Sequence, residues 1–318
     1  MADIDVVIVN YHSAAHAYNC VRSVHDVAEA DGVDARIYVV NNSDDATELR
    51  DAVGRAGGAT IIENGRNLGF GAACNIGARQ GDAGVILFLN PDAALLPGCL
   101  KTCLARLRDP DHANIGIAGP QLQDPNGALI PSCSRLPTCV DLLWRTAGLH
   151  ALFPQFEYPY LSRAAHRRSG PVGQVMGAAL FIGRDLFQRL NGFDEAFFLY
   201  YEDVDVCARA AALGKVCWYE CDAHASHLGG GSSSHDSSLA MALHIASRLT
   251  YARRHFGVLA HAAVLVVALL IELPLRIVKT LVNGGSVRAV IATFGKIAGF
   301  GVLGTPVDVP DAKPRAVS

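Results

Sequence analysis

The sequence lacks an excess of charge of either sign, and this excludes one broad class of function. Its 27 Lys and Arg residues stand against 30 Asp and Glu, so the formal net charge is -3 over 318 residues. No stretch interleaves basic with aromatic residues, so nothing provides the electropositive surface that nucleic acids require. We therefore expect no nucleic-acid partner.

Signals for export and for zinc are also missing. The N-terminus has no basic start followed by an apolar run and a small-residue cleavage site, because Ile4–Val9 has the character of a strand. We therefore expect the N-terminus to be cytoplasmic.

The nine cysteines include no Cys-x-x-Cys pair, since the closest pairs are Cys99 with Cys103 and Cys217 with Cys221. We expect reduced and mostly buried thiols.

Continuous apolar runs alternate with helical periodicity over the first 120 residues. The runs are IDVVIV, ARIYVV, ATIIE, GVILFLN and NIGIAG, while Ala14–Ala28 and Pro97–Leu107 have the apolar spacing of helices. Apolar strands without a polar face, separated by helices, are typical of a mainly parallel, Rossmann-like α/β sheet covered on both sides. Ligands bind beyond the carboxyl ends of such strands.

The pattern changes after Gln121. LQDPNGALI predicts a hairpin around Asn126 and Gly127, and residues 131–171 have so little periodicity that we expect a long excursion over the site. VGQVMGAALFIG and VCWYE then predict two strands, with a helix at Asp185–Leu190 between them.

The stretch YYEDVDVCARAAALG, residues 200–214, crowds three acids behind an aromatic run. Like charges beside apolar rings raise one another's pKa values and destabilise the fold unless a proton or a cation compensates. The apolar spacing predicts a helix on which Asp205 pairs with Arg209, while Glu202 lies in the first turn, where the helix dipole favours an anion. Asp203 has no evident local partner. The alternative is an acidic helix start with one ion pair.

Three further stretches suit a phosphate and metal site. The glycines of NGRNLGFGAACNIG, residues 64–77, permit close backbone approach at a helix start, where free amides favour phosphate. In LFLNPDA a strand leads directly to Asp92, whose carboxylate is a hard ligand for Mg²⁺ or Mn²⁺. In HASHLGGGSSSH, His227 can complete an Mn²⁺ shell and the Gly/Ser loop can close over phosphates. The glycine spacing does not match the dinucleotide fingerprint, which disfavours a nicotinamide-dependent oxidoreductase.

In this order and spacing, the motifs resemble glycosyltransferase family 2, with the GT-A fold, and within it the bacterial rhamnosyltransferase-like branch. The resemblance rests on VIVNYHS, NLGFGAACNIG, LFLNPDA and GFDEAFFLYYEDVDVCARAAALG followed by HLGGGS, over residues 3–257. It implies an inverting, metal-dependent transferase that moves a sugar from a nucleotide diphosphate donor, with dTDP-rhamnose the leading choice. The acceptor would be a glycan or a polyprenyl-linked sugar in cell-surface polysaccharide synthesis. A catalytically silent sugar-nucleotide- or glycan-binding subunit is the alternative.

The resemblance also implies roles for particular residues. Asp203, paired with Glu202, would be the general base, and Asp92 with His227 would hold Mg²⁺ or Mn²⁺. The donor-binding residues would be Asn10, Tyr11, Asn42, Asn67, Gly69, Asn75 and Asn90. These roles agree with inverting transfer, which needs a base for the acceptor proton and a cation for the departing diphosphate. Two positions depart from the family: Asn41 stands where an Asp usually precedes the Asn, and Asn90 replaces the first acid of the metal motif.

The predicted domain organisation is a GT-A domain over residues 1–257 followed by C-terminal helices and a tail over residues 258–318. Residues 1–120 would bind the nucleotide sugar, and residues 121–257 would form the acceptor and catalytic half. Val258–Ile271 carries no charge, but it is shorter than the roughly 20 residues that a membrane-spanning helix needs. We therefore expect the C-terminal part to be a helical appendage.

The charges around this apolar segment are mostly positive. Between residues 244 and 304 Glu272 is the only acid, against Arg248, Arg253, Arg254, Arg276, Lys279, Arg288 and Lys296. An apolar helix with basic flanks suits an anionic lipid surface. We expect peripheral contact with the cytoplasmic face of the inner membrane. The alternative is a helical hairpin that packs on the main domain or forms a homodimer contact.

Overall fold

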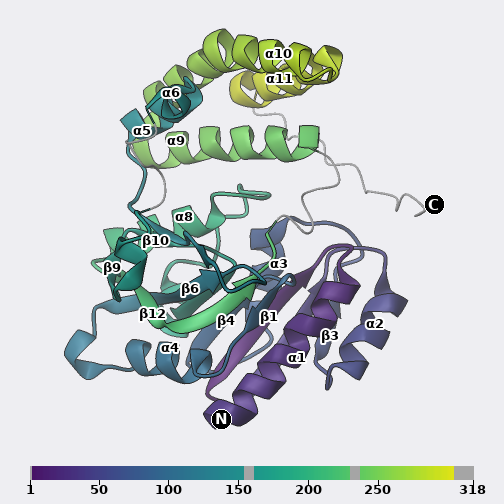
Figure 1. The fold of residues 1–318 in the computed structure, drawn as a ribbon, viewed down its shortest axis with the longest axis vertical. Coiled ribbons are helices and arrows are strands. Elements are labelled where there is room, and N and C mark those ends of the chain that lie inside the picture. The colour runs from purple at the N-terminus through teal and green to yellow at the C-terminus, as the bar shows by residue number, and fades with distance from the viewer. Residues whose placement is uncertain (1, 154–160, 230–236, 304–318) are drawn as a thin grey trace. The chain divides into compact units, whose positions relative to one another are not determined.

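The computed structural model describes residues 2–153, 161–229 and 237–303 (Figure 1). The chain divides into two compact units. We call the first, formed by Met1–Leu136, Tyr160–Glu195 and Glu202–Ser232, the sheet unit. We call the second, formed by Pro137–Pro159, Ala196–Tyr201 and Ser233–Ser318, the helical unit.

The sheet unit is built on a ten-stranded sheet with the order β3-β2-β1-β4-β11-β6-β12-β5, to which β7 adds on β6 and β9 on β12. Its strands are β1 (Ile4–Asn10), β2 (Ala35–Asn41), β3 (Thr60–Glu63), β4 (Val85–Leu89), β5 (Ala93–Leu95), β6 (Ile115–Gln123), β7 (Leu129–Ile130), β9 (Gly170–Val172), β11 (Ala179–Gly183) and β12 (Val216–His227). Two short strands, β8 (Cys133–Ser134) and β10 (Gln174–Val175), form a separate antiparallel pair.

Strand direction brings many strand ends to one edge of this sheet. β1 is parallel to β2 and β4, β2 is parallel to β3, and β6 is parallel to β12. β11 runs antiparallel to both β4 and β6. The carboxyl ends of β1, β2, β4, β6 and β12 therefore share one edge with the start of β11. A mixed sheet of mainly parallel strands confirms the predicted α/β class.

Helices cover both faces of the sheet, which explains why its strands are apolar throughout (Figure 1). Along β1, Ile8 packs in the core on one face and Val9 in the core on the other. The helices of this unit are α1 (Ala14–Asp31), α2 (Ala46–Arg55), α3 (Phe70–Ala78), α4 (Cys99–Leu107), α7 (Arg184–Arg189) and α8 (Glu202–Ala212). The first face is covered by α1, α2 and α4, and the second by α3, α7 and α8.

The predicted hairpin after Gln121 is confirmed, because Leu122 pairs with Ile130 and Gly127 between them has a φ of 82°.

The excursion over residues 131–171 contains more structure than its weak periodicity indicates. It includes β8, α5 (Cys139–Thr146), α6 (Leu149–Leu152), the 3-10 turn η2 (Ala165–Arg167) and the start of β9. Thr138 and Asp141 form a reciprocal capping box at the start of α5.

The helical unit contains α5, α6, α9 (Ser237–Val267), a π-helical turn η3 (Ala268–Glu272), α10 (Leu273–Val282) and α11 (Val287–Leu303). Gly257 interrupts α9 with non-helical angles, φ 86° and ψ -177°, so α9 is two helices joined at a kink. Glu272, in the π-helical turn, pairs with Arg248 of α9 and with Arg276 of α10. These helices confirm the predicted C-terminal helical appendage.

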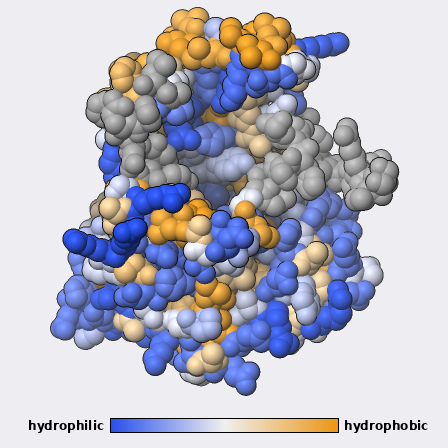
Figure 2. Space-filling model, in the orientation of Figure 1, coloured by the Kyte–Doolittle hydropathy of each residue, from blue (hydrophilic) through white to orange (hydrophobic). Residues whose placement is uncertain are grey.

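One helical stretch among the described residues, Ser238–Val282, is long and apolar enough to cross a membrane by length and composition alone. The mean hydropathy of its most apolar window is 2.4, and 33% of that window is buried within the protein. Figure 2 shows that apolar residues gather on the surface over α10 and α11.

Candidate active site

The side chain of Asn10, at the end of β1, is fully buried and bonds within the protein. Its Nδ2 donates to Asn41 Oδ1 and to Asp45 Oδ1, each at 3.0 Å, and its Oδ1 accepts a hydrogen bond from Ser13 Oγ at 3.0 Å. Buried amides are costly unless they are paired, so these bonds fix the loop that follows β2. Asp45, which the sequence did not single out, is one of the groups that shape this loop.

A second amide network joins the end of β2 to the glycine-rich turn. Asn42 Nδ2 donates to Asn67 Oδ1 at 3.2 Å and to Gly69 O at 3.1 Å, and Asn67 Oδ1 also accepts from Gly69 N at 3.0 Å. Gly69 has a φ of 87° and directly precedes α3. The structure therefore brings three predicted donor-binding residues together at the amino end of a helix, where phosphate binding is favoured.

Asn75 lies outside that network and holds a different loop. Its Nδ2 donates to Phe193 O at 2.9 Å and to Glu195 Oε1 at 3.0 Å, while its Oδ1 accepts from Phe193 N at 2.8 Å. A Cβ on Gly192, whose φ is 74°, would overlap Asn75 Oδ1. Asn75 therefore anchors the loop of the GFDE motif, which leads along the chain to α8.

Tyr11 and Asn90 follow β1 and β4, two strands that end at the same edge of the sheet. The ring of Tyr11 is half-buried and stands edge-on to His12, with 4.6 Å between the ring centres. The backbone amide of Asn90 donates to Ala178 O at 2.9 Å. This bond ties the end of β4 to the start of β11.

The structure also brings Asp92 and His227 together. Because β5 pairs with β12, Ala93 lies opposite His227, and Asp92 Oδ1 is 3.3 Å from His227 Nε2. Both side chains are nearly buried, with exposed fractions of 8% and 11%. Two neighbouring ligands of an octahedral Mg²⁺ or Mn²⁺ ion are about 3 Å apart, and an oxygen with an imidazole nitrogen suits Mn²⁺. The pair therefore fits a divalent cation. The Gly/Ser loop at residues 230–236 lies outside the described residues.

Asp203, in the first turn of α8, accepts hydrogen bonds from a segment far away in the sequence. Its Oδ2 accepts from Gly177 N at 2.8 Å and from Gln174 Nε2 at 3.3 Å, and its Oδ1 accepts from Val204 N at 2.8 Å. Burial raises the pKa of Asp203, and these donors oppose that rise because they stabilise the carboxylate. Gln174 and Gly177 contact this predicted site residue, and the sequence analysis missed them because no local pattern marks them.

Glu202 differs from its neighbour, because its side chain is buried and its Oε2 has no hydrogen-bond partner among the described residues. Burial, together with the charge of Asp203, raises the pKa of Glu202 to about 8. Burial and the charge of Asp203 therefore outweigh the helix dipole, which favours an anion at this position. The dipole contributes roughly 1 kcal/mol, whereas a pKa shift of this size corresponds to several kcal/mol. At neutral pH this raised pKa favours the protonated form of Glu202.

Asp205, the third acid of this stretch, forms the ion pair with Arg209 that the sequence predicts. Asp205 Oδ2 lies 2.6 Å from Arg209 Nε, and Arg209 Nη1 also donates to Leu190 O at 2.8 Å and to Gly192 O at 3.0 Å. Asp205 is therefore held in an ion pair with Arg209, whereas the carboxylate of Asp203 bonds to Gly177 and Gln174.

Two adjacent residues link Asp203 to the strand that leads to Asp92. Gly177 N donates to Asp203, and the next residue, Ala178, accepts the hydrogen bond from Asn90 N. Asp92 follows Asn90 by two positions. The carboxylate of Asp203 and the Asp92–His227 pair therefore belong to one edge of the sheet.

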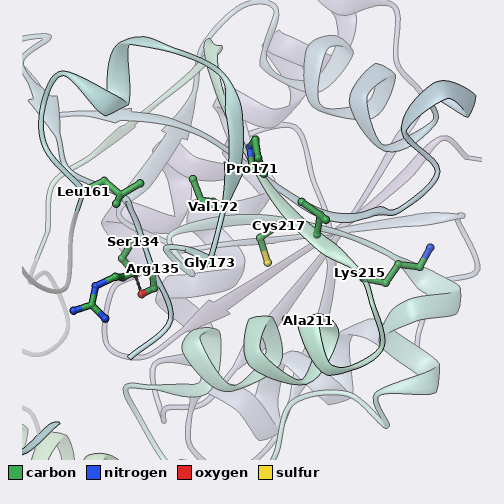
Figure 3. Close-up of a pocket in the computed structure, with 10 residues that line it drawn as sticks. Ser134, Arg135, Leu161, Pro171, Val172, Gly173, Ala211, Lys215 and Cys217 are labelled. Atoms are coloured by element: carbon green, nitrogen blue, oxygen red, sulfur yellow. Dashed lines mark hydrogen bonds between the residues drawn. The ribbon is translucent and has the colours of Figure 1, made fainter. Parts of the chain in front are cut away.

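Two other features of the sheet unit lie apart from these residues. A pocket of about 400 Å³ is formed by β9, β12 and the last turn of α8, with Val172, Gly173 and Cys217 among its lining residues (Figure 3). It contains none of the predicted site residues. A group of potential metal ligands at Glu220, Cys221 and Asp222 lies on β12, but Glu220 already pairs with Arg106 at 3.2 Å.

The cysteine prediction is confirmed, since all nine thiols are free and seven of them are buried.

An α/β sheet whose strand ends carry amide networks and a metal-compatible pair is compatible with an enzyme that binds a nucleotide sugar. The family model described as "Glycosyltransferase like family 2" matches residues 2–252, and the chain belongs to this family.

Curated relatives agree with the rhamnosyltransferase-like branch, which is thereby confirmed. N-acetylglucosaminyl-diphospho-decaprenol L-rhamnosyltransferase of Mycobacterium tuberculosis is 30% identical over 277 residues, which cover 81% of this chain and 87% of the relative. Rhamnosyltransferase WbbL of Escherichia coli is 25% identical over 225 residues, which cover 68% of this chain and 81% of the relative.

Solved structures confirm the GT-A fold. The mannosyltransferase PcManGT of Pyrobaculum calidifontis, in complex with GDP-Man and Mn²⁺, matches with a TM-score of 0.54 and 15% identity over 94% of this chain and 80% of that one. GalNAc-T7, with UDP, GalNAc and Mn²⁺, matches with a TM-score of 0.53 and 15% identity over 71% of this chain and 43% of that one. A divalent metal is present in both.

Proposed function

We propose that this glycosyltransferase moves a rhamnosyl residue from dTDP-rhamnose to a polyprenyl-diphosphate-linked sugar, with inversion at the anomeric carbon and with Mg²⁺ or Mn²⁺ as cofactor. The observation that carries the proposal is the Asp92–His227 pair at the same sheet edge as Asp203. The names of the mycobacterial and enterobacterial relatives support a rhamnosyl donor. The mycobacterial relative's name also supports the lipid-linked acceptor.

In this proposal Asp203 is the general base. Its carboxylate takes the proton of the acceptor hydroxyl as that oxygen forms a bond to the anomeric carbon, and the bond from that carbon to the diphosphate oxygen breaks. The dTDP leaves with the bonding electron pair. Gly177 and Gln174 orient the Asp203 carboxylate, and the proton on Glu202 removes a competing negative charge beside it.

Asp92 and His227 would hold the divalent cation, which when bound neutralises charge on the leaving diphosphate. The turn formed by Asn42, Asn67 and Gly69 would bind the nucleotide diphosphate at the start of α3. Asn10 and Asn75 support the site through the loops that they hold, and Tyr11 and Asn90 would line the donor pocket at the ends of β1 and β4.

The test is transfer by the full-length protein with dTDP-rhamnose, UDP-N-acetylglucosamine and GDP-mannose, each with Mn²⁺ or with a chelator. The acceptor is a polyprenyl-diphosphate-linked N-acetylglucosamine. We expect metal-dependent transfer from dTDP-rhamnose and an inverted linkage by NMR. Faster transfer from another donor would reject the rhamnosyl proposal. Donor binding without transfer to the acceptor would favour the catalytically silent subunit.

We also propose that the chain after Gly257 docks on the anionic cytoplasmic face of the inner membrane, as the appendage to a GT-A domain over residues 1–257. Leu259, Val266, Leu270 and Val278 recur at helical spacing and are 86%, 51%, 71% and 59% exposed. Exposed basic residues accompany this apolar face: Arg253, Arg254, Lys279, Arg288 and Lys296. Apolar exposure with basic neighbours suits insertion among anionic headgroups.

Sedimentation with phosphatidylglycerol-containing vesicles tests this docking. We expect Leu270→Glu combined with Val278→Glu to weaken vesicle binding by at least about tenfold, because two apolar side chains that insert among the lipids would be replaced by charges. Leu213→Glu, on an exposed residue of the sheet unit, serves as the matched control. Unchanged vesicle binding, together with a dimer that the double variant dissociates, would instead assign the face to a homodimer contact.

A further inference from the structure

Two consecutive tyrosines that precede the acidic pair have a left-handed backbone. The φ angles of Tyr200 and Tyr201 are 70° and 69°. Large side chains rarely adopt this conformation, because Cβ then approaches the following carbonyl oxygen. Among the described residues only two other non-glycine residues have a positive φ, His12 and Asn191. Two such residues in succession persist only where surrounding contacts hold them.

One of those contacts is a hydrogen bond from α9. Ser247 Oγ donates to the backbone carbonyl of Leu199 at 2.7 Å, and the side chain of Ser247 is buried. Leu199 directly precedes the two tyrosines, so this bond fixes the chain at the entrance to the left-handed turn. Leu199 is half-buried, so its carbonyl, on losing this donor, would recover only part of the bond from solvent, which makes the bond costly to remove.

The other contacts are aromatic. The His244 ring centre lies 5.5 Å from the ring centres of both Tyr200 and Tyr201, and the Tyr251 ring centre lies 5.5 Å from that of Tyr201. Burial and the nearby arginine charges lower the pKa of His244 to about 3, so its ring is neutral and packs as an aromatic residue. Three residues of α9, each about one helical turn from the next, therefore hold one short segment.

We infer that Ser247, His244 and Tyr251 are positioning residues for the general base, because they hold the left-handed segment that sets where α8 begins. Asp203 is two residues beyond Tyr201, and its bond to Gly177 N is 2.8 Å long. A displacement of about 1 Å would carry that bond beyond hydrogen-bonding distance. The inference rests on the proposed role of Asp203 as base.

The first experiment compares Ser247→Ala with Thr250→Ala in the full-length protein. Thr250 lies on the same helix and its Oγ1 donates to Ala246 O at 3.0 Å, within α9 itself. We expect Ser247→Ala to lower kcat about tenfold with unchanged Kd for dTDP and Mn²⁺, and Thr250→Ala to stay within about twofold of wild type. Ser247→Thr, which keeps the hydroxyl, should recover kcat.

A second pair of variants, both at His244, distinguishes loss of the contact from misfolding. His244→Phe keeps a neutral ring beside the tyrosines and should retain kcat within about threefold, whereas His244→Ala should lose about tenfold. Hydrogen exchange supplies a readout that needs no activity. We expect faster exchange of the amides of residues 199–204 and of Gly177 in Ser247→Ala and His244→Ala, and not in Thr250→Ala.

Equal effects of Ser247→Ala and Thr250→Ala on kcat and on exchange would overturn the inference. So would a wild-type kcat in both Ser247→Ala and His244→Ala. If the wild-type protein transfers no sugar from any donor, the proposed function fails, and the exchange comparison still decides whether α9 holds the start of α8.

Discussion

The carboxylate of Asp203 accepts a 2.8 Å hydrogen bond from the backbone amide of Gly177, a residue 26 positions earlier in the chain. This bond aims the acid at the edge of the sheet where the strands end, and it opposes the rise in the pKa of Asp203 that burial causes. A carboxylate that hydrogen bonds hold in one orientation is suited to take a proton, which is the role proposed for Asp203.

Replacing Asp203 by Asn tests the base directly. The amide keeps the size of the side chain but cannot take a proton, so we expect transfer to fall by at least about 10³-fold while the Kd for dTDP with Mn²⁺ stays unchanged. Single-turnover transfer and calorimetric binding would measure the two quantities. Asp222→Asn, at an exposed position, is the control. Transfer within about tenfold of wild type would remove Asp203 from this role.

Glu202 makes stability depend on pH. Its pKa is raised from 4.5 to about 8 in the folded protein, so the folded state binds more protons than the unfolded state between these values. Stability is therefore lost as pH rises from about 4.5 to about 8. Glu202→Gln should remove this dependence and be roughly 2 kcal/mol more stable than wild type at about pH 8.5, with little difference near pH 4.5. Urea unfolding at both pH values measures it, and parallel pH profiles for the two proteins would contradict the assignment.

Asp92 is predicted to affect donor binding only when metal is present. Asp92→Ala removes one of two proposed metal ligands, so the Kd for dTDP with Mn²⁺ should rise roughly tenfold or more. Binding measured in a chelator should be unchanged, and this serves as the internal control. Because His227 is the second proposed ligand, His227→Ala should show the same pattern. An equal loss with and without Mn²⁺ would mean that Asp92 supports the fold and not the cation.

The side chain of Asn75 leaves no room for a Cβ at position 192. Gly192→Ala should destabilise the protein by about 2 kcal/mol or more, because a Cβ at this position has an unfavourable φ and would overlap Asn75 Oδ1. Gly32 has a similar φ of 66° but open space around its Cβ position, so Gly32→Ala should cost only about 1 kcal/mol. Chemical denaturation of both variants gives the comparison. Equal losses would show that the contact with Asn75 is unimportant.

Much of the sheet could be predicted from local pattern. IDVVIV and ARIYVV are mainly apolar on both faces, as strands covered on both sides must be, so β1 and β2 occur where expected. The Asp205–Arg209 pair followed from helical spacing alone. The meeting of Asp92 with His227 followed from the family resemblance, since the two residues belong to distant segments that the local pattern does not pair.

The sequence by itself determined the α/β class, the order of the motifs and the chemistry of the acids, because periodicity and residue type act over a few neighbouring positions. Tertiary structure decided how deeply each acid is buried and which groups orient it. Packing buries Glu202 and raises its pKa, and Asp203 is oriented by Gly177 and Gln174, which are close to it only in the folded chain. Asn75, predicted to bind the donor, bonds a loop 118 positions away in the sequence. Burial and long-range hydrogen bonds arise only when distant segments pack, so no local pattern records them.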